Sequence, residues 1–311
     1  MTTNDVKELN LNLDATTFKP LFQTNPMKHA AAMALNWAII LAAMCFCALY
    51  FHPAAYFLAV VVIGARMHAL AILMHDATHY RFLKNRKWND LITNITTMYP
   101  LFTSIGQYRQ NHLRHHKHLN TDDDPDWVSK LGAEAFRFPK TKWEFLRIVF
   151  SYLTLYRGVK DAIWFLKRFA PSEKKPAARE GDKLPRLAFY IVLFSAITIL
   201  GLWKYYALFW IVPYLSTFFM FQYIRSVAEH FGELEYDHEL TSSRTVKATA
   251  FERFFLAPHN VGYHLEHHLY PGVPFYNLPA LHQLLMQEAG YRDKAHITKG
   301  YVRGLMEELG G

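Results

Sequence analysis

Two long apolar stretches lie in the first quarter of the chain. Residues 29–50 are almost wholly apolar, and residues 54–74 are apolar apart from Arg66 and His68. Each is about as long as the roughly 20 residues that a membrane-crossing helix needs. Only residues 51–53 separate the two stretches. The pattern therefore predicts a helical hairpin that returns the chain to its starting side of the membrane.

A second apolar pair covers residues 187–203 and 205–223, with Lys204 between them. This spacing predicts another tight hairpin, hinged at Lys204. The expected fold is an all-α integral membrane protein with four transmembrane helices in two hairpins. Both ends of the chain would lie on one side of the membrane.

Weaker apolar stretches cover residues 91–105, which Pro100 interrupts, and 143–169, which is basic and aromatic at helical spacing. Such patterns favour helices that lie in the membrane interface. We expect residues 1–28 to form an N-terminal segment, 29–285 the membrane domain and 286–311 a tail. Residues 172–185, polar with Pro and Gly, are expected to be a linker.

The positive charge is concentrated in one part of the chain. Of the 34 lysines and arginines, 21 lie between Arg81 and Arg186, whereas the two hairpin turns carry one, Lys204. Because basic loops stay in the cytoplasm, the charge places this loop, both termini and a histidine-rich cap there. The N-terminus has no signal-peptide pattern. Nothing arranges the basic residues with aromatic ones as a nucleic-acid surface, so no nucleic acid is expected.

Ten of the 17 histidines fall in three clusters. They are His75 and His79; His112, His115, His116 and His118; and His259, His264, His267 and His268. The hairpins place all three clusters on one membrane face. Residues three or four apart share a helix face, and adjacent residues point about 100° apart. A box with the spacing H-x-x-H-H can therefore reach two metal ions, which suits a binuclear site.

The ligand type narrows the choice of metal. Imidazole ligands suit iron, zinc or copper. The zinc-protease motif H-E-x-x-H is absent, and eight or more histidines exceed one tetrahedral zinc. Cys45 and Cys47 lie in an apolar run without the spacing of a disulfide framework or a thiolate site. A pair of iron ions held by imidazoles is the interpretation that remains.

These boxes resemble those of the membrane fatty acid desaturase and hydroxylase superfamily. Its signature of H-x-x-x-H, H-x-x-H-H and a late H-x-x-H-H is matched at His75, at His112 and at His264. The resemblance covers roughly residues 30–285. It implies nine metal ligands: His75, His79, His112, His115, His116, His230, His264, His267 and His268.

Other polar residues near the boxes are candidates for orienting these ligands through hydrogen bonds, as carboxylates and imidazoles around metal sites do. They are Asp76, His118, Asp126, Glu229, His259 and Glu266. Arg66 is unusual because ionisable side chains are rare inside membrane spans.

The resemblance also implies the chemistry. Two iron ions and O2 as co-substrate would oxidise an unactivated C–H bond of a fatty acyl or other lipid substrate, with desaturation as the first expectation. Hydroxylases, ketolases, acetylenases and terminal-alkene-forming decarboxylases of the same superfamily are alternatives. A histidine-rich metal transporter and a non-catalytic membrane protein are alternatives from other classes.

The electron donor is expected to be a separate protein. The chain has no haem-attachment motif, no nucleotide-binding glycine motif and no cysteine set for an iron–sulfur cluster. A ferredoxin, a rubredoxin or a cytochrome b5 could dock near Arg114, Lys117 and Lys130. A bacterial inner membrane is the expected location.

Overall fold

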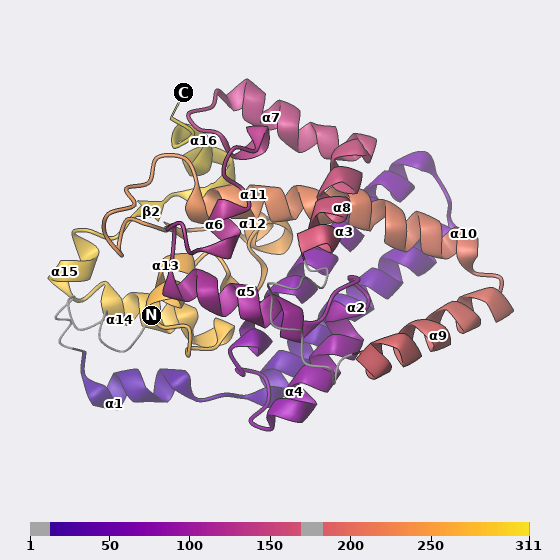
Figure 1. Cartoon of the computed structure of the whole chain (residues 1–311), viewed down its shortest axis with the longest axis horizontal. Helices are drawn as coiled ribbons and strands as arrows, with labels where there is room; N and C mark the ends of the chain where they lie inside the picture. The colour runs from indigo at the N-terminus through magenta and orange to yellow at the C-terminus, as the bar shows by residue number, and fades with distance from the viewer. Residues whose placement is uncertain (1–12, 169–182, 311) are drawn as a thin grey trace. The chain divides into compact units, whose positions relative to one another are not determined.

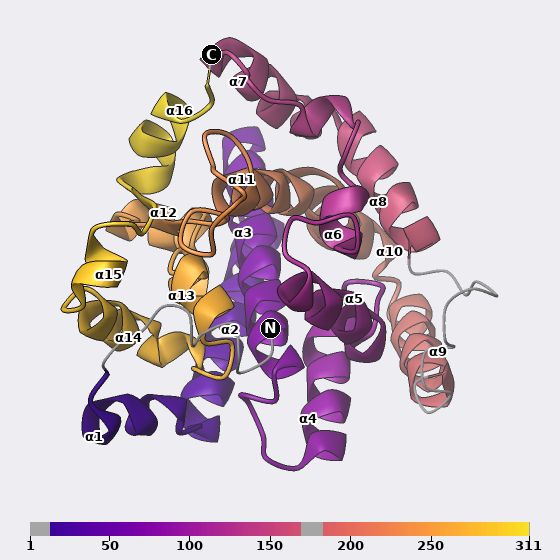
Figure 2. The ribbon, with the colours of Figure 1, turned by 60° about the vertical axis from the view of Figure 1, so that its left-hand side comes forward.

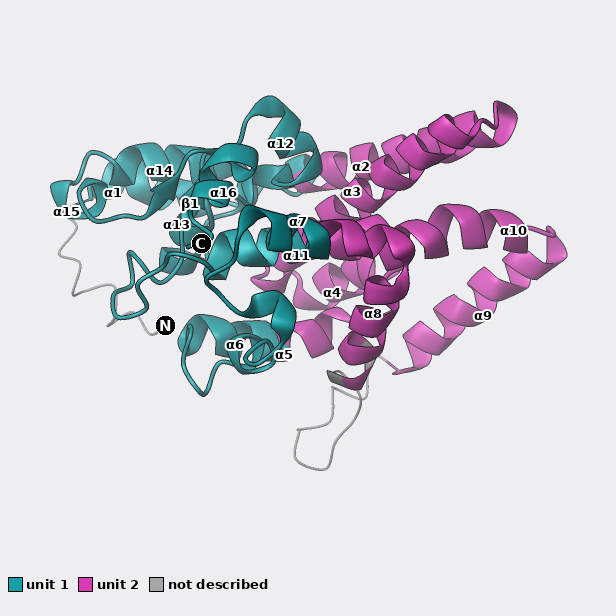
Figure 3. Ribbon diagram, turned by 90° about the horizontal axis from the view of Figure 1, so that it is seen from above, with its two compact units in different colours: residues 1–28, 110–148, 223–311 teal, residues 29–109, 149–222 magenta. Residues whose placement is uncertain are grey.

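The computed structural model describes residues 13–168 and 183–310, which are mostly helical, with only two strands of two residues each. The chain divides into two compact units (Figure 3). Unit 1 comprises residues 1–28, 110–148 and 223–311, and unit 2 comprises residues 29–109 and 149–222. The predicted linker at 172–185 lies almost entirely outside the described residues.

The first predicted hairpin is present in unit 2. Helix α2 (Pro26–Leu49) and helix α3 (Pro53–Thr78) follow each other across a short turn (Figure 1). His52 starts α3, because its ring nitrogen accepts a hydrogen bond from the backbone of Ala54 at 3.2 Å. Both helices are long and apolar enough to cross a membrane. The predicted positions of these two spans are therefore confirmed as helices.

Two polar pairs join α2 to α3. The Arg66 guanidinium donates to the amide oxygen of Asn36 at 3.2 Å, and both side chains are buried. His29 Nδ1 lies 3.4 Å from a carboxylate oxygen of Asp76. Buried polar groups need such partners because water cannot reach them. Asn36 is thus one partner of Arg66, the ionisable residue that is unusual in this span.

The second hairpin turns earlier than predicted. Helix α9 (Lys183–Ile199) ends before Gly201, and helix α10 (Trp203–Tyr206) begins the return (Figure 1). The hinge therefore lies at residues 200–202, and the placement at Lys204 was wrong: Gly201 adopts a φ of +66°, which glycine alone reaches without strain. A continuous helical stretch, Trp203–His230, is the third candidate span among the described residues. Helix α9 has 17 residues and exposes Leu187, Ile191 and other apolar side chains.

The stretch Trp203–His230 contains two π-helical turns before helix α11 (Phe219–His230). These are η7 (Ala207–Ile211) and η8 (Tyr214–Phe218). Turn η8 packs against α3 at Gly64, where an added Cβ would lie 2.0 Å from Thr217 Oγ1. Glycine is therefore required at this crossing. The other elements of unit 2 are α4 (Arg86–Thr93), the π-turn η3 (Asn94–Met98), η5 (Tyr152–Thr154) and α8 (Tyr156–Arg168).

Among the described residues, four helices contain a boundary between the two units: α2, α5 (Ile105–Lys117), α7 (Lys142–Ser151) and α11. Unit 1 otherwise consists of short elements. They are α1 (Ala15–Phe18), η2 (Lys19–Phe22), α6 (Pro125–Val128), η4 (Glu134–Phe136), α12 (Ala250–Phe255), η9 (Pro258–Asn260), α13 (His264–Leu269), η10 (Phe275–Asn277), α14 (Leu278–Leu285), α15 (Ala289–Arg292), η11 (Gly300–Gly304) and α16 (Leu305–Glu307).

The core of unit 1 lies around α13 and α14. Leu265, Leu269, Leu281 and Leu285 are fully buried there. The N-terminal turns pack on this core (Figure 2), where Asn277 donates to the backbone oxygen of Leu21 at 2.8 Å. Two short parallel strands, β1 (Thr245–Val246) and β2 (Ile297–Thr298), tie the C-terminal part to the segment before α12. Helix α13, which carries the third histidine box, is thus held from several sides.

Candidate metal centre

Seven of the nine predicted ligands lie in unit 1, on three helices. Helix α5 carries His112, His115 and His116, α11 ends at His230, and α13 carries His264, His267 and His268. All seven imidazoles are buried, with at most 6% of each residue exposed. The structure places both H-x-x-H-H boxes on helices, α5 and α13, where residues three or four apart share a face. His230 lies within the last turn of a helix.

Four of these histidines form one group, the His115 group: His115, His230, His264 and His268. Their ligand nitrogens all lie within 4.8 Å of one another. His264 Nε2 is 2.9 Å from His230 Nε2 and 3.0 Å from His268 Nε2. Residues from three helices thus bring four imidazoles to one point.

The other three form the His116 group, which contains His112, His116 and His267. His116 Nε2 lies 3.0 Å from His112 Nε2 and 3.0 Å from His267 Nε2. Each H-x-x-H-H box contributes to both groups, since His115 and His116 belong to different groups, as do His267 and His268. The divergence of adjacent imidazoles is what the sequence predicted for a binuclear site.

The donor set fits two metal ions. An imidazole binds a metal through one ring nitrogen at about 2 Å, so two such nitrogens at right angles stand about 3 Å apart. The observed Nε2 separations of 2.9–3.0 Å match this geometry. Burial, together with the neighbouring His268 and His230, holds the pKa of His264 well below its ordinary range. A neutral imidazole is the form that binds metal.

His75 and His79 lie in unit 2, at the C-terminal end of α3. His75 is buried, His79 is half-buried, and their ring centroids are 5.8 Å apart. Arg109 fixes this helix end, because its Nε donates to the backbone oxygen of Thr78 at 2.9 Å. The same guanidinium makes two hydrogen bonds to Asp90, at 2.7 and 2.8 Å. The first box is thus held on a capped helix terminus.

Asp124 contacts a predicted ligand directly, and sequence reasoning missed it. Its Oδ2 lies 2.8 Å from His115 Nδ1. The neighbouring candidate, Asp126, pairs instead with Lys130, whose Nζ lies 2.6 Å away and also donates to Ser226 at 2.7 Å. The sequence signal for Asp124 was its position before Pro125, which is typical of a helix N-cap.

Glu229 and Glu266, both predicted, are fully buried but have different surroundings. Glu229 lies 3.5 Å from His264 Nδ1 and accepts a hydrogen bond from Arg225 at 2.9 Å. Glu266 bonds Thr245 at 2.5 Å, Tyr291 at 2.7 Å and the ring of His282. Glu229 therefore faces a ligand, whereas Glu266 joins α13 to α14, α15 and β1.

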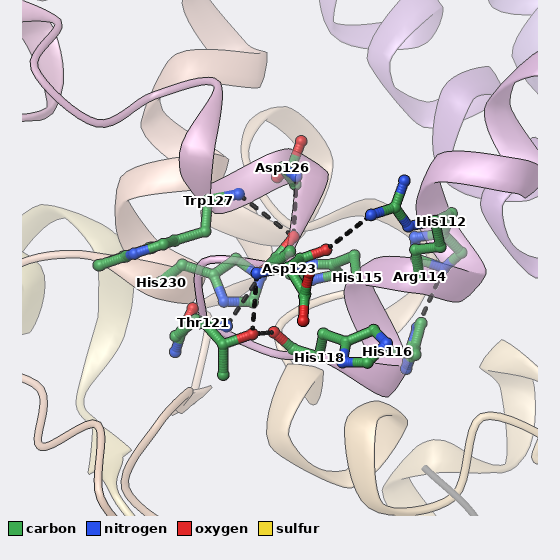
Figure 4. A network of polar contacts seen from close by, with 12 residues as sticks. His112, Arg114, His115, His116, His118, Thr121, Asp123, Asp126, Trp127 and His230 are labelled. Atoms are coloured by element: carbon green, nitrogen blue, oxygen red, sulfur yellow. Dashed lines mark hydrogen bonds and ion pairs between the residues drawn. The ribbon is translucent and has the colours of Figure 1, made fainter. Parts of the chain in front are cut away.

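His118 and His259 lie outside both histidine groups. The backbone oxygen of His118 accepts a hydrogen bond from the Thr121 hydroxyl at 2.7 Å (Figure 4). His259 has a left-handed φ of 52°, and its ring lies 5.2 Å from that of Phe275. His282, which stands alone in the sequence, proves to be the partner of Glu266. No local sequence pattern predicts the pair of Glu266 and His282, because the two residues lie 16 positions apart.

Comparisons with known proteins identify the family of this chain. The model of the family described as fatty acid desaturase matches residues 51–300. Dihydrorhizobitoxine desaturase of Bradyrhizobium elkanii is 32% identical over 80% of this chain and 73% of its own length. An sn-1 oleoyl-lipid 12-desaturase of Anabaena variabilis is 24% identical over 73% of this chain and 67% of its own. An sn-1 acyl-lipid omega-3 desaturase (ferredoxin) of a Nostoc strain is 25% identical over 69% and 63%.

Proposed function

The chain belongs to the fatty acid desaturase family, and from this premise we propose that it is an iron-dependent membrane desaturase of a lipid acyl chain. The observation that carries the proposal is the sorting of seven buried imidazoles into two groups, with four nitrogens converging in one and three in the other. A single catalytic metal would need only one group. Two groups fit the two iron ions that the histidine boxes imply.

We propose that the His115 group holds one iron. The His116 group, with His75 and His79 added from the first box, would hold the other. When bound and reduced, the iron ions would allow dioxygen to oxidise a C–H bond of the substrate. The chain's own residues bind the ions, keep their imidazoles neutral and exclude water. Asp76, His118, Glu229, His259 and Glu266 remain predicted orienting residues, and of these Glu229 has the most direct support, from its position beside His264. The carboxylate of Asp126 pairs with Lys130 instead, so we do not propose that Asp126 orients a ligand.

A membrane location supports a lipid substrate. Three helices have the length and composition of membrane spans, and α9 exposes apolar side chains as a fourth span would. The relatives named for oleoyl-lipid and acyl-lipid substrates favour an acyl chain as the substrate here. The four-span topology with both termini and the metal site in the cytoplasm, in a bacterial inner membrane, is part of the same proposal.

The second candidate substrate is dihydrorhizobitoxine or a compound like it. It is favoured by the 32% identity to the Bradyrhizobium elkanii desaturase, which is higher than that to the acyl-lipid desaturases reported above. The catalytic machinery proposed here would serve both substrates. Only the identity of the oxidised molecule separates the two candidates.

A ferredoxin is the first choice of electron donor. The Nostoc relative is named for ferredoxin, whereas rubredoxin and cytochrome b5 rest on the resemblance alone. The basic residues Arg114 and Lys117 are exposed, as docking of an acidic protein requires, but Asp122 and Asp123 are exposed on the same short segment. The docking site therefore stays a prediction.

The test is product analysis with the purified protein in detergent. The protein would be loaded with iron, supplied with reduced ferredoxin and oxygen, and given either acyl lipid or dihydrorhizobitoxine. A product lighter by two hydrogens, together with about two irons per chain, is expected with the acyl lipid. The His116→Ala variant should be inactive, whereas His52→Asn, which keeps the exposed cap of α3, should be active.

Other outcomes would assign a different activity. An added oxygen atom would identify a hydroxylase, and a lost carboxyl group a decarboxylase. Desaturation of dihydrorhizobitoxine alone would replace the acyl-lipid proposal by the second candidate. Bound metal without oxygen consumption would refute the proposed reaction.

A further inference from the structure

Asp124 is a carboxylate beside the histidine groups that has several hydrogen-bond partners. Its side chain is fully buried. Oδ1 accepts from the backbone N–H of Asp126 at 2.8 Å and of Trp127 at 3.2 Å. Oδ2 accepts from the backbone N–H of Asn120 at 3.0 Å and faces His115 Nδ1 at 2.8 Å. Four donors thus converge on one carboxylate.

The three backbone donors hold the Asp124 carboxylate in one orientation, because hydrogen bonds to an ionised acceptor are short and directional. A fixed, charged acceptor selects the His115 tautomer that carries its proton on Nδ1. The lone pair of His115 Nε2 then points away from Asp124. Since an imidazole has only these two nitrogens, Nε2 is the atom left for a metal.

We propose that Asp124 is a positioning residue for the metal centre: it fixes the tautomer and ring plane of His115 and increases the electron donation of that imidazole to the bound ion. The inference rests on the proposed function, because it concerns the iron held by the His115 group. It assigns a role to Asp124 that neither the histidine boxes nor the family match specifies.

The surrounding loop is built to keep this contact. Asn120, whose backbone donates to Asp124, has a left-handed φ of 57° and also donates its side-chain amide to the Ser242 backbone oxygen at 2.6 Å. Asp124 itself caps α6, whose first residue is Pro125. The carboxylate is therefore attached to both the loop before it and the helix after it. Its position relative to His115 does not depend on an exposed side chain.

The chain offers a matched control two residues away. Asp126 is also an aspartate in the same turn, but its carboxylate pairs with Lys130 and is one-third exposed. Asp124→Asn keeps a good helix cap, since asparagine caps as well as aspartate, but removes the charge. Asp126→Asn makes the same chemical change without touching the contact to His115. Asp124→Ser provides a second capping variant, should the asparagine variant fold poorly.

The experiment titrates ferrous iron into the metal-free, detergent-purified protein and measures the reduction potential of the bound iron. We expect Asp124→Asn to bind the iron of the His115 group about 10- to 100-fold more weakly, as the loss of such partners does elsewhere. The potential of that iron should rise, because a less electron-rich imidazole stabilises the ferric state less. Asp126→Asn should match the wild type in both measurements, with an unchanged melting temperature in both variants.

The outcomes separate this inference from the proposed function. Equal affinity and potential in Asp124→Asn and the wild type would refute the positioning role while leaving the desaturase proposal intact. An equal loss in Asp126→Asn would refute it too, since the effect would then belong to the turn as a whole. A wild-type protein that takes up no iron would overturn the proposed function and this inference together.

Discussion

The Nε2 atoms of His264 and His230 lie 2.9 Å apart, although 34 positions separate the two residues in the chain. One comes from the first position of α13 and the other from the last turn of α11. Their approach completes the His115 group, to which α5 contributes the fourth imidazole. The proposed ligand set of this group therefore includes a histidine, His230, that lies outside every box.

Removing one ligand from each group should affect one iron at a time. We expect His264→Ala and His267→Ala each to retain about half of the wild-type iron, because each deletes a ligand of a different group. The double variant should bind almost none, and all three should be inactive. Iron content per chain, measured by mass spectrometry of the metal, checks this. Complete loss of iron in either single variant would mean that the two groups do not bind independently.

Replacing Glu266 should destabilise the protein strongly. Glu266→Ala would leave Thr245, Tyr291 and His282 without their shared acceptor, and each buried donor left unpaired costs about 1–3 kcal/mol. We expect a loss of several kcal/mol, measured as a lower melting temperature of the metal-free protein. The control is Glu307→Ala, which removes an exposed carboxylate paired with Arg303. That change should alter stability by no more than about 0.5 kcal/mol.

Gly158→Ala should disturb the packing of unit 2. A Cβ at this position of α8 would lie 1.6 Å from the backbone oxygen of Leu215 in η8. Backbone cannot move aside as a flexible side chain can, so we expect at least the roughly 1–3 kcal/mol of overpacking. Val159→Ala, next to it and 39% exposed, should be nearly neutral. Equal melting temperatures for the two variants would contradict this close packing.

The C-terminal contacts should be sensitive to acid. Burial of Glu308 opposes ionisation, but hydrogen bonds from His296 and Thr298 and the charge of Arg244 outweigh it and hold its pKa below the ordinary range. A carboxylate with a lowered pKa stabilises the fold at neutral pH, and this stabilisation is lost as the pH falls through the folded-state pKa.

Glu308→Gln should therefore melt at a lower temperature than the wild type at pH 7. The difference should shrink as the pH falls from about 5 to about 3, where the wild-type carboxyl group is protonated as well. Melting curves at a series of pH values measure it. Glu307→Gln, whose carboxylate is exposed, serves as the control. A constant difference across this range would show that Glu308 acts through its shape and not its charge.

Spacing along single helices allowed much of the site to be predicted. His115 and His116 diverge into different groups because adjacent helical residues point in different directions. Apolar length likewise predicted α2 and α3. Both inferences depend on regular local geometry, which a sequence carries directly.

Contacts between distant residues could not be predicted in this way. Asn36 lies 30 positions from Arg66, and His282 lies 16 from Glu266. Asp124 was missed in favour of Asp126 because both stand in one acidic turn, and only the fold decides which carboxylate faces inward. The hinge near Gly201 was misplaced because charge at Lys204 was given more weight than the backbone freedom of glycine.

Glu308 also has a consequence for the order of assembly. Its side chain pairs with Arg244, which donates to the backbone oxygen of Phe231, and its own backbone oxygen accepts from Glu233. The segment that directly follows His230 is thus held by hydrogen bonds to Glu308, which lies 78 positions after His230 and is translated later. During synthesis, the His115 group therefore lacks this support until residue 308 has left the ribosome. We therefore expect iron to bind the proposed site only after this part of the chain has been translated.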